Sequence, residues 1–403
     1  MNKQIVYKNS IHQKNLNLNI IKNLNKKFNN VYQNIILDLN TPNNVYNTLS
    51  KSFKLNFNLR DIKKFKKFHS VVIIGMGGSI LGAESIYSFL KKKIKKNFTF
   101  IDDIDDDKLK EFKKKNKLNK ILFIVISKSG NTIETISNLL AFKIVKKNSK
   151  NIIIISEKNN ALHSLSKKMK IHFIEHKKYI GGRYSVLSEV GMVPAYLMGV
   201  NIKKIRKNIL KHFNSEKKKF LKSSSIILAN IIKKNKIKNL VFFNYLPELN
   251  EFLYWLQQLI AESLGKGGNG FLPIISKAPK DHHSLLQLYL DGPKDKIFYV
   301  FSGPKNGNKK LKPKIFNNKF KFLQNKSLYS IKNAQKIAFV EALKKNKIPF
   351  REFRIKEVKE EILGELLSFF ILETSIIGKL ININPFNQPA VEQVKVTTKK
   401  LLI

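Results

Sequence analysis

Cysteine is absent from the 403 residues of the chain. Disulfide bonds and thiolate metal ligands are therefore excluded, and a reducing compartment is the natural setting. Long apolar runs are also missing, because the strongest stretches, 121–126 and 152–155, have the length of strands rather than the roughly 20 residues of a membrane span. Residues 1–30 lack the apolar run of a signal peptide. These absences predict a cytoplasmic protein without a membrane partner.

Acidic side chains are scarce, with 28 Asp and Glu against 76 Lys and Arg and a formal net charge of +48. A charge of this size would normally suggest a nucleic-acid partner. The lysines, however, are spread along the whole chain, and no basic segment is interleaved with aromatic residues. We therefore predict no nucleic-acid partner and expect the charge to speed the capture of small anions.

Arginine is rare in spite of the high positive charge, and one of the five arginines stands in the sequence Gly-Gly-Arg-Tyr-Ser at 181–185. Glycines allow backbone and ligand to approach closely, and a planar guanidinium suits an oxyanion better than an ammonium does. Arg183 is therefore a candidate functional residue. A glycine-rich turn with an incidental surface arginine remains the alternative on this motif alone.

Strands and helices alternate along most of the chain, which predicts an α/β fold with parallel sheets covered on both faces. Two such series follow one another, so we expect a helical N-terminal region at 1–60, a first domain at 61–200, a second domain at 201–380 and a C-terminal arm at 381–403. The expected strands are 71–74, 98–101, 121–126, 152–155, 171–174, 240–243, 271–275, 297–301 and 350–355. The expected helices include 184–198, 248–264, 283–290, 331–345 and 359–373.

A glycine-rich loop, Gly-Met-Gly-Gly-Ser at 75–79, directly follows the first strand and opens a helix. Ligands of open α/β sheets bind at the carboxyl ends of strands, where Gly77, Gly78 and Ser79 can direct backbone N–H groups at an anion. A dinucleotide fingerprint would need glycine where Ile80 stands. Asp102, after the next strand, keeps a dinucleotide-dependent oxidoreductase open as an alternative.

A second polar loop, Ser-Lys-Ser-Gly-Asn-Thr at 127–132, follows the apolar strand 121–126. Its hydroxyl groups and the start of the following helix can form a cup for a phosphate group, with donors from Ser127, Lys128, Ser129 and Thr132. The alternative is an ordinary helix N-cap made by Ser129 or Asn131, which is compatible with phosphate binding.

These motifs together resemble the glucose-6-phosphate isomerase family. Gly-Met-Gly-Gly-Ser, Ser-Lys-Ser-Gly-Asn-Thr-Ile-Glu-Thr and Gly-Gly-Arg-Tyr-Ser occur in the order expected of that family. The second half adds Gln-Gln-Leu-Ile-Ala-Glu-Ser-Leu-Gly-Lys at 257–266, His-Ser-Leu-Leu-Gln-Leu at 283–288 and Pro-Phe-Asn-Gln-Pro-Ala-Val-Glu-Gln-Val-Lys at 385–395. The resemblance runs from about 71 to 395.

The resemblance implies two sugar-isomerase domains, each an αβα sandwich around a parallel sheet. It further implies reversible conversion of glucose 6-phosphate to fructose 6-phosphate without a metal ion or organic cofactor, in a homodimer whose His283 acts in trans. The implied catalytic residues are Glu262 as base, His283 for ring opening, Lys395, and Arg183 facing the enediolate. The implied sugar-phosphate contacts are Gly77, Gly78, Ser79, Ser127, Lys128, Ser129, Thr132 and Gln258.

Several alternatives remain open beside this resemblance. Glu262 alone could be a helix-end carboxylate paired with Lys266, and spacing does not choose between His282 and His283. A dual phosphoglucose and phosphomannose isomerase would use the same chemistry. A non-catalytic regulatory module that binds a sugar phosphate would need the phosphate cup without the base, the histidine or Lys395.

Overall fold

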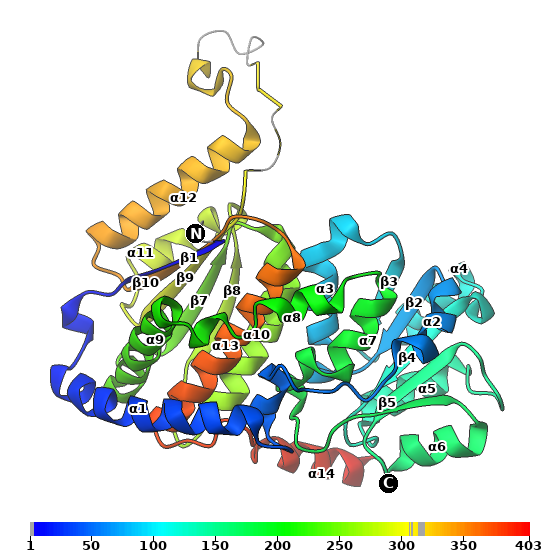
Figure 1. The fold of residues 1–403 in the computed structure, drawn as a ribbon. Coiled ribbons are helices and arrows are strands. Elements are labelled where there is room, and N and C mark those ends of the chain that lie inside the picture. The colour runs from blue at the N-terminus through cyan, green and yellow to red at the C-terminus, as the bar shows by residue number, and fades with distance from the viewer. Residues whose placement is uncertain (1–3, 306, 308, 313–318) are drawn as a thin grey trace.

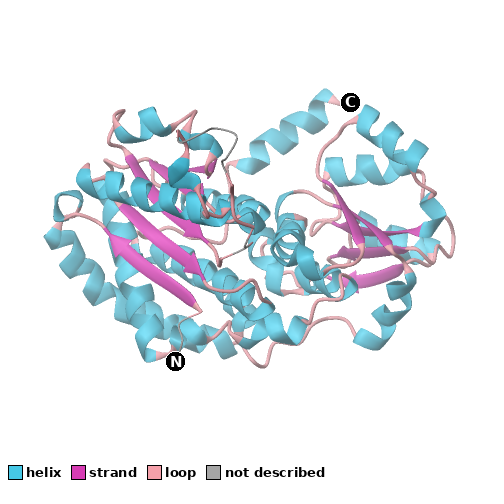
Figure 2. Ribbon diagram, turned by 90° about the horizontal axis from the view of Figure 1, so that it is seen from above, coloured by secondary structure: helices cyan, strands magenta, loops and turns pink. Residues whose placement is uncertain are grey.

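The fold consists of two sheets covered by helices, and the computed structural model describes residues 4–305, 307, 309–312 and 319–403 (Figure 1). Helices lie on both faces of each sheet and between the two sheets (Figure 2). None of the helices in these described ranges is both long and apolar enough to span a membrane. The α/β class expected from the alternating pattern is therefore confirmed.

The first sheet has five parallel strands in the order β3 (Asn97–Ile101), β2 (Ser70–Ile74), β4 (Ile121–Ile126), β5 (Ile152–Ser156) and β6 (His172–Glu175). All five were expected from the sequence. Every residue of β4 is buried, and alternate side chains enter two separate cores on the two faces of the sheet. The helices of this part are α3 (Leu81–Leu90), α4 (Asp106–Lys115), α5 (Ile133–Phe142), α6 (Ala161–Met169) and α7 (Glu189–Leu197).

The second sheet is mixed, in the order β1 (Ile5–Ser10), β10 (Phe350–Ile355), β9 (Lys296–Ser302), β7 (Asn239–Asn244) and β8 (Leu272–Lys277). Four strands are parallel, and β1 runs antiparallel to β10. The expectation of a purely helical region at 1–60 and of only parallel sheets is therefore wrong at β1. Only Ile5 of this edge strand is buried, so the alternation that marks a strand is weak.

The remaining helices are α1 (Leu18–Asn40), α2 (Leu59–Lys63), α8 (Ile202–Lys207), α9 (Ser215–Lys234), α10 (Asn250–Leu264), α11 (Leu286–Leu290), α12 (Leu328–Lys345), α13 (Glu360–Leu380) and α14 (Val391–Leu401). The expected helix 184–198 is divided at Ser188 into a 3₁₀ segment and α7. The expected helix 283–290 becomes regular only at Leu286. The division of the chain into domains stays a prediction.

The two sheets share a strand order around their centres, β3-β2-β4-β5 in one and β8-β7-β9-β10 in the other. In each sheet the order in which the chain adds strands reverses between β2 and β4 or between β7 and β9, and ligands of such sheets bind beside that point, outside the carboxyl ends of the strands. We call the space beside the loops after β2 and β4 the first crevice. The space beside the loops after β7 and β9 is the second crevice.

Candidate active site

Arg183 lies at the centre of the first crevice and is only 1% exposed. Its Nη1 donates to Glu262 Oε2 over 3.0 Å, and its Nε donates to Ser263 Oγ over 2.8 Å. A guanidinium has five N–H donors, and the remaining three reach the C-terminal arm. Their acceptors are Gln388 Oε1 at 2.5 Å, Pro385 O at 2.6 Å and Asn387 O at 3.1 Å. The rare arginine is thus a buried junction rather than an incidental surface residue.

Glu262 projects from α10 with 29% of its side chain exposed. Its second oxygen, Oε1, accepts a hydrogen bond of 2.9 Å from Gln258 Nε2, one helical turn earlier. Pairing with Lys266 is not observed, because the Lys266 ammonium donates to Ser263 O and Asn384 O instead. The carboxylate is therefore fixed by two donors while one edge stays accessible, as a proton-transferring base requires.

Glycines bring the three motifs into contact. Gly77 has φ +51°, and a methyl group there would lie 2.7 Å from Gln258 Nε2. A methyl group at Gly78 would lie 2.1 Å from the backbone carbon of Gly182, beside Arg183. Gln258 Oε1 is buried and has no hydrogen-bond partner among the described residues, so it is free to accept from a ligand hydroxyl.

The loop after β4 has the geometry of an open cup. Ser127 Oγ and Thr132 Oγ1 are 2.9 Å apart, and Ser129 Oγ accepts from the backbone N–H of Asn131. Thr132 is the N-cap of α5, and no side chain of the described part of the chain caps this helix. The alternative of an ordinary N-cap made by Ser129 or Asn131 is therefore not observed. The amides of the first turn remain available to an anion.

The cation of this loop is partly desolvated. Burial lowers the pKa of Lys128 although Glu157 Oε1 lies 3.7 Å from its ammonium. Burial, followed by the positive charge of Arg183, lowers the pKa of Lys266 to about 8. Two lysines and one arginine thus meet around a site where an anion would be strongly stabilised.

A cavity of about 390 Å³ separates the start of α5 from α14. Ser129 and Thr132 line one side, and Lys395 and Lys399 line the other. None of the residues of α14 is buried, and the Lys395 ammonium pairs with Glu392 over 2.8 Å. The structure thus brings Lys395 to the phosphate cup predicted from the sequence.

The two adjacent histidines differ sharply. His282 packs against Phe243 and Phe339 and lies 2.6 Å from Tyr245 Oη through its Nε2. His283 is exposed, and within the described ranges its imidazole forms no hydrogen bond or ion pair. Glu262 and Arg183 are therefore not joined to His283 by any such contact in the single chain.

Residues that the sequence did not single out complete the site. Tyr184 Oη lies 2.8 Å from Ser263 Oγ and donates to Pro385 O over 3.0 Å. Phe386 packs against Tyr184, and Lys266 holds Asn384 O. Tyr184, Lys266 and Phe386 belong to the motifs found in the sequence. Only the three-dimensional structure shows that the C-terminal arm is bound through Arg183. In the described ranges no group of three or more His, Asp or Glu side chains is placed to hold a metal ion.

Known proteins resemble this chain over most of its length. A family model described as phosphoglucose isomerase matches residues 43–402. The chain is 35% identical over 351 residues to a glucose-6-phosphate isomerase of Methanocaldococcus jannaschii, covering 84% of this chain and 85% of that one. It is 32% identical to a probable glucose-6-phosphate isomerase of Methanococcus maripaludis, covering 97% and 93%.

Among solved structures, a hypothetical protein of Thermus thermophilus has the same fold, with a TM-score of 0.83 at 21% identity and coverage of 98% and 100%. The family model and the archaeal relatives each span most of the chain. The chain belongs to the phosphoglucose isomerase family.

Proposed function

We propose that the chain interconverts glucose 6-phosphate and fructose 6-phosphate by aldose–ketose isomerisation. The observation that carries this proposal is the Glu262 carboxylate, held between Gln258 Nε2 and Arg183 Nη1 beside the phosphate cup. Membership of the family supports the choice of substrate. The proposed chemistry is proton transfer by side chains.

Glu262 is the proposed base. It removes the proton from C2 of the open-chain aldose and returns it to C1, and a second proton passes from O2 to O1, so that the carbonyl group moves from C1 to C2. The intermediate is a cis-enediol or enediolate, whose negative charge develops on O1 and O2. Arg183 Nη1 lies beside the same carboxylate, so its fixed charge can stabilise those oxygens without reorganisation.

The phosphate group is proposed to bind in the cup formed by the loops after β2 and β4. Hydroxyl groups of Ser79, Ser127, Ser129 and Thr132, the ammonium of Lys128 and backbone amides at Gly77 and Gly78 are the proposed donors. The uncapped start of α5 adds the positive end of a helix dipole. Gln258 Oε1, buried and unpartnered, is the proposed acceptor for a sugar hydroxyl.

Ring opening is assigned to His283 and Lys395, which remove a proton from the anomeric hydroxyl and deliver one to the ring oxygen. Lys395 already faces the cup. The His283 side chain is exposed and forms no hydrogen bond with the residues that the structure describes, which supports its action in the site of a second subunit. We therefore propose a homodimer in which each site is completed in trans, located in the cytoplasm, where a chain without cysteine meets a reducing environment.

The direct test is a coupled assay of glucose 6-phosphate formation from fructose 6-phosphate. We expect turnover without added metal ion, accompanied by solvent hydrogen exchange at C2 of glucose 6-phosphate. Absence of turnover by the folded protein would overturn the proposal.

A mixing experiment tests the assignment of His283 to the partner's site. Glu262→Gln and His283→Ala chains are nearly inactive alone, but a heterodimer would contain one intact site. After subunit exchange, activity should recover to about a quarter of wild type in a random mixture. A mixture of Glu262→Gln with the double variant cannot rebuild an intact site and is the control. Proven exchange without recovery would mean that each chain builds its own site.

A further inference from the structure

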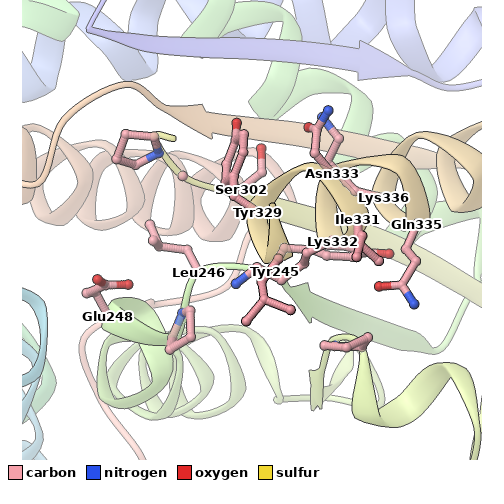
Figure 3. A pocket seen from close by; sticks show the side chains of 15 residues that line it. Tyr245, Leu246, Glu248, Ser302, Tyr329, Ile331, Lys332, Asn333, Gln335 and Lys336 are labelled. Carbon is pink, nitrogen blue, oxygen red and sulfur yellow. The ribbon is translucent and has the colours of Figure 1, made fainter. Parts of the chain in front are cut away.

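The second crevice contains a pocket that the isomerase chemistry leaves unused. It lies beside the loops after β7 and β9, the position that corresponds in strand order to the phosphate cup beside β2 and β4. Its residues come from these loops, from α12 and, with Pro279, from the turn after β8, and α12 faces the loops across the pocket (Figure 3). The pocket therefore occupies the place where an open α/β sheet binds ligands.

The wall of this pocket is mainly apolar. Its volume is about 420 Å³, within the range of small-molecule sites, and its lining includes Tyr245, Leu246, Pro247, Pro279 and Ile331. Gly303 lets the loop after β9 close against the wall, because a methyl group there would lie 2.4 Å from Leu246 Cδ1. Such a lining favours an occupant with an apolar body.

Two lysines supply positive charge to one side of the same pocket. Lys332 and Lys336 lie one turn apart on α12, and both line the pocket while half-buried. Neither ammonium forms a hydrogen bond or ion pair with another residue of the described ranges. The carboxylate in the lining, Glu248, is already paired with Lys92 over 2.8 Å. Glu248 and Glu352 attract these two lysines without ion-pair contact, so within the described residues neither ammonium is directly paired.

A bare phosphate group does not suit this crevice. Ser327 Oγ caps the start of α12 by accepting from Ser330 N–H, and Ser330 Oγ accepts from Ser327 N–H, so these two amides are occupied. Pro247 and Glu248 stand in the loop after β7, where the loop after β2 has Gly77 and Gly78. Proline has no N–H, so this loop has one backbone donor fewer for a phosphate group than the loop after β2.

We propose that the second crevice binds a small organic anion that has an apolar or aromatic body and one acidic group. The body contacts Tyr245, Leu246 and Ile331, and the acidic group pairs with Lys332 and Lys336. This site is separate from the phosphate cup, and it takes a different class of ligand.

Tyr245, in the wall of the pocket, connects the pocket to the turn that carries His282 and His283. Tyr245 Oη lies 2.6 Å from His282 Nε2, and His282 precedes the exposed His283. Burial raises the pKa of Tyr245 and lowers that of His282, so the phenol donates to a neutral imidazole. An anion seated on Tyr245 would disturb this bond and the placement of His283. This consequence rests on the proposed isomerase function.

The binding test uses 1-anilinonaphthalene-8-sulfonate, which has an aromatic body and one sulfonate, and follows its fluorescence with the full-length protein. Lys332→Gln/Lys336→Gln should weaken binding by about tenfold or more, since two charge-assisted contacts are lost. Lys344→Gln/Lys345→Gln removes the same charge from exposed positions of α12 and is the matched control. Equal weakening in both pairs, or no binding to the wild type, would overturn the proposal.

Competition identifies which crevice the probe occupies. Neither fructose 6-phosphate nor inorganic phosphate at matched ionic strength should displace the probe, because the first needs the phosphate cup and the second lacks an apolar body. Displacement by either would overturn the assignment. In the isomerase assay the probe should lower kcat without raising KM, and purely competitive inhibition would contradict the link through Tyr245. An inactive wild type would refute the proposed function, while the fluorescence result would still decide the site.

Discussion

The first and second crevices show how one strand order can support two kinds of site. In the first, Gly77 and Gly78 allow close backbone approach and α5 starts without a side-chain cap, so donors face an anion. In the second, Pro247 has no N–H to donate, and the capping box formed by Ser327 and Ser330 occupies their amides at the start of α12. Topology therefore determines where a ligand can lie, while a few loop residues determine its chemistry.

The largest expected effect is on kcat, and it should distinguish Glu262 on α10 from Glu341 on α12. Glu262→Gln should lower kcat by ~10²–10⁴ with little change in KM, because an amide cannot accept the C2 proton. Glu341 is exposed and distant from both proposed crevice linings, so Glu341→Gln is the matched control. Turnover close to wild type in Glu262→Gln would show that the first crevice uses another base.

The next comparison concerns the two adjacent histidines, of which His282 contacts Tyr245 in the lining of the second crevice. His283→Ala should lower turnover of the cyclic substrate by ~10²-fold or more and leave the free energy of unfolding almost unchanged. His282→Ala should instead destabilise the fold by about 1–3 kcal/mol, because it removes the Tyr245 hydrogen bond and three aromatic contacts. Enzyme assays and urea unfolding of both variants would measure turnover and the free energy of unfolding. The opposite pattern would make His282 the catalytic residue and His283 the structural one.

His282 also has a predictable pH dependence. Burial lowers its folded-state pKa below the usual value of about 6.5, so the unfolded chain binds the proton more tightly. The free energy of unfolding should therefore fall as pH drops through about 6.5, and this contribution should be lost in His282→Gln. Urea unfolding between pH 5 and 8 would measure it, with His283→Gln as control.

A smaller effect tests the phosphate cup. Thr132→Val keeps the shape of the side chain but removes the hydroxyl that lies 2.9 Å from Ser127 Oγ. KM for the sugar phosphate should rise about 10- to 100-fold, the value of a hydrogen bond to a charged group. Ser223→Ala, on the exposed face of α9, removes a hydroxyl elsewhere and should leave KM unchanged. An unchanged KM in Thr132→Val would show that the phosphate group does not bind at Thr132 in the first crevice.

Most of the fold was predictable because several of its strands are buried along almost their whole length. Strands such as β4 and β5 are continuous apolar runs, and their length and flanking helices indicate a parallel sheet. Edge strand β1 was not predictable, since one buried residue leaves almost no pattern and its pairing depends on β10. The late start of α11 depends likewise on the turn at 280–282, which the helical pattern does not reveal.

The residue types of the site were predictable, but their connections were not. Glycines 77 and 78 were expected to approach an anion, and the structure shows that they also make room for Gln258 and Gly182. The binding of the arm through Arg183 joins residues 202 to 205 positions apart, a separation that no local pattern encodes. Such contacts arise from tertiary packing alone.

The smallest effect concerns the α14 side of the first crevice. Lys399 lies one turn beyond Lys395, and both line the cavity opposite Ser129 and Thr132. Lys399 is exposed, so its attraction for a bound phosphate is screened by water, and Lys399→Gln should raise KM only about two- to fivefold without changing kcat. Lys400→Gln changes the same charge outside the cavity lining and should have no effect.

The Lys399 effect should also shrink as salt rises from about 0.05 to about 0.5 M, since screening weakens exposed charge pairs. Equal changes in both variants would mean that the overall positive charge of α14, rather than the position of Lys399 in the first crevice, attracts the substrate.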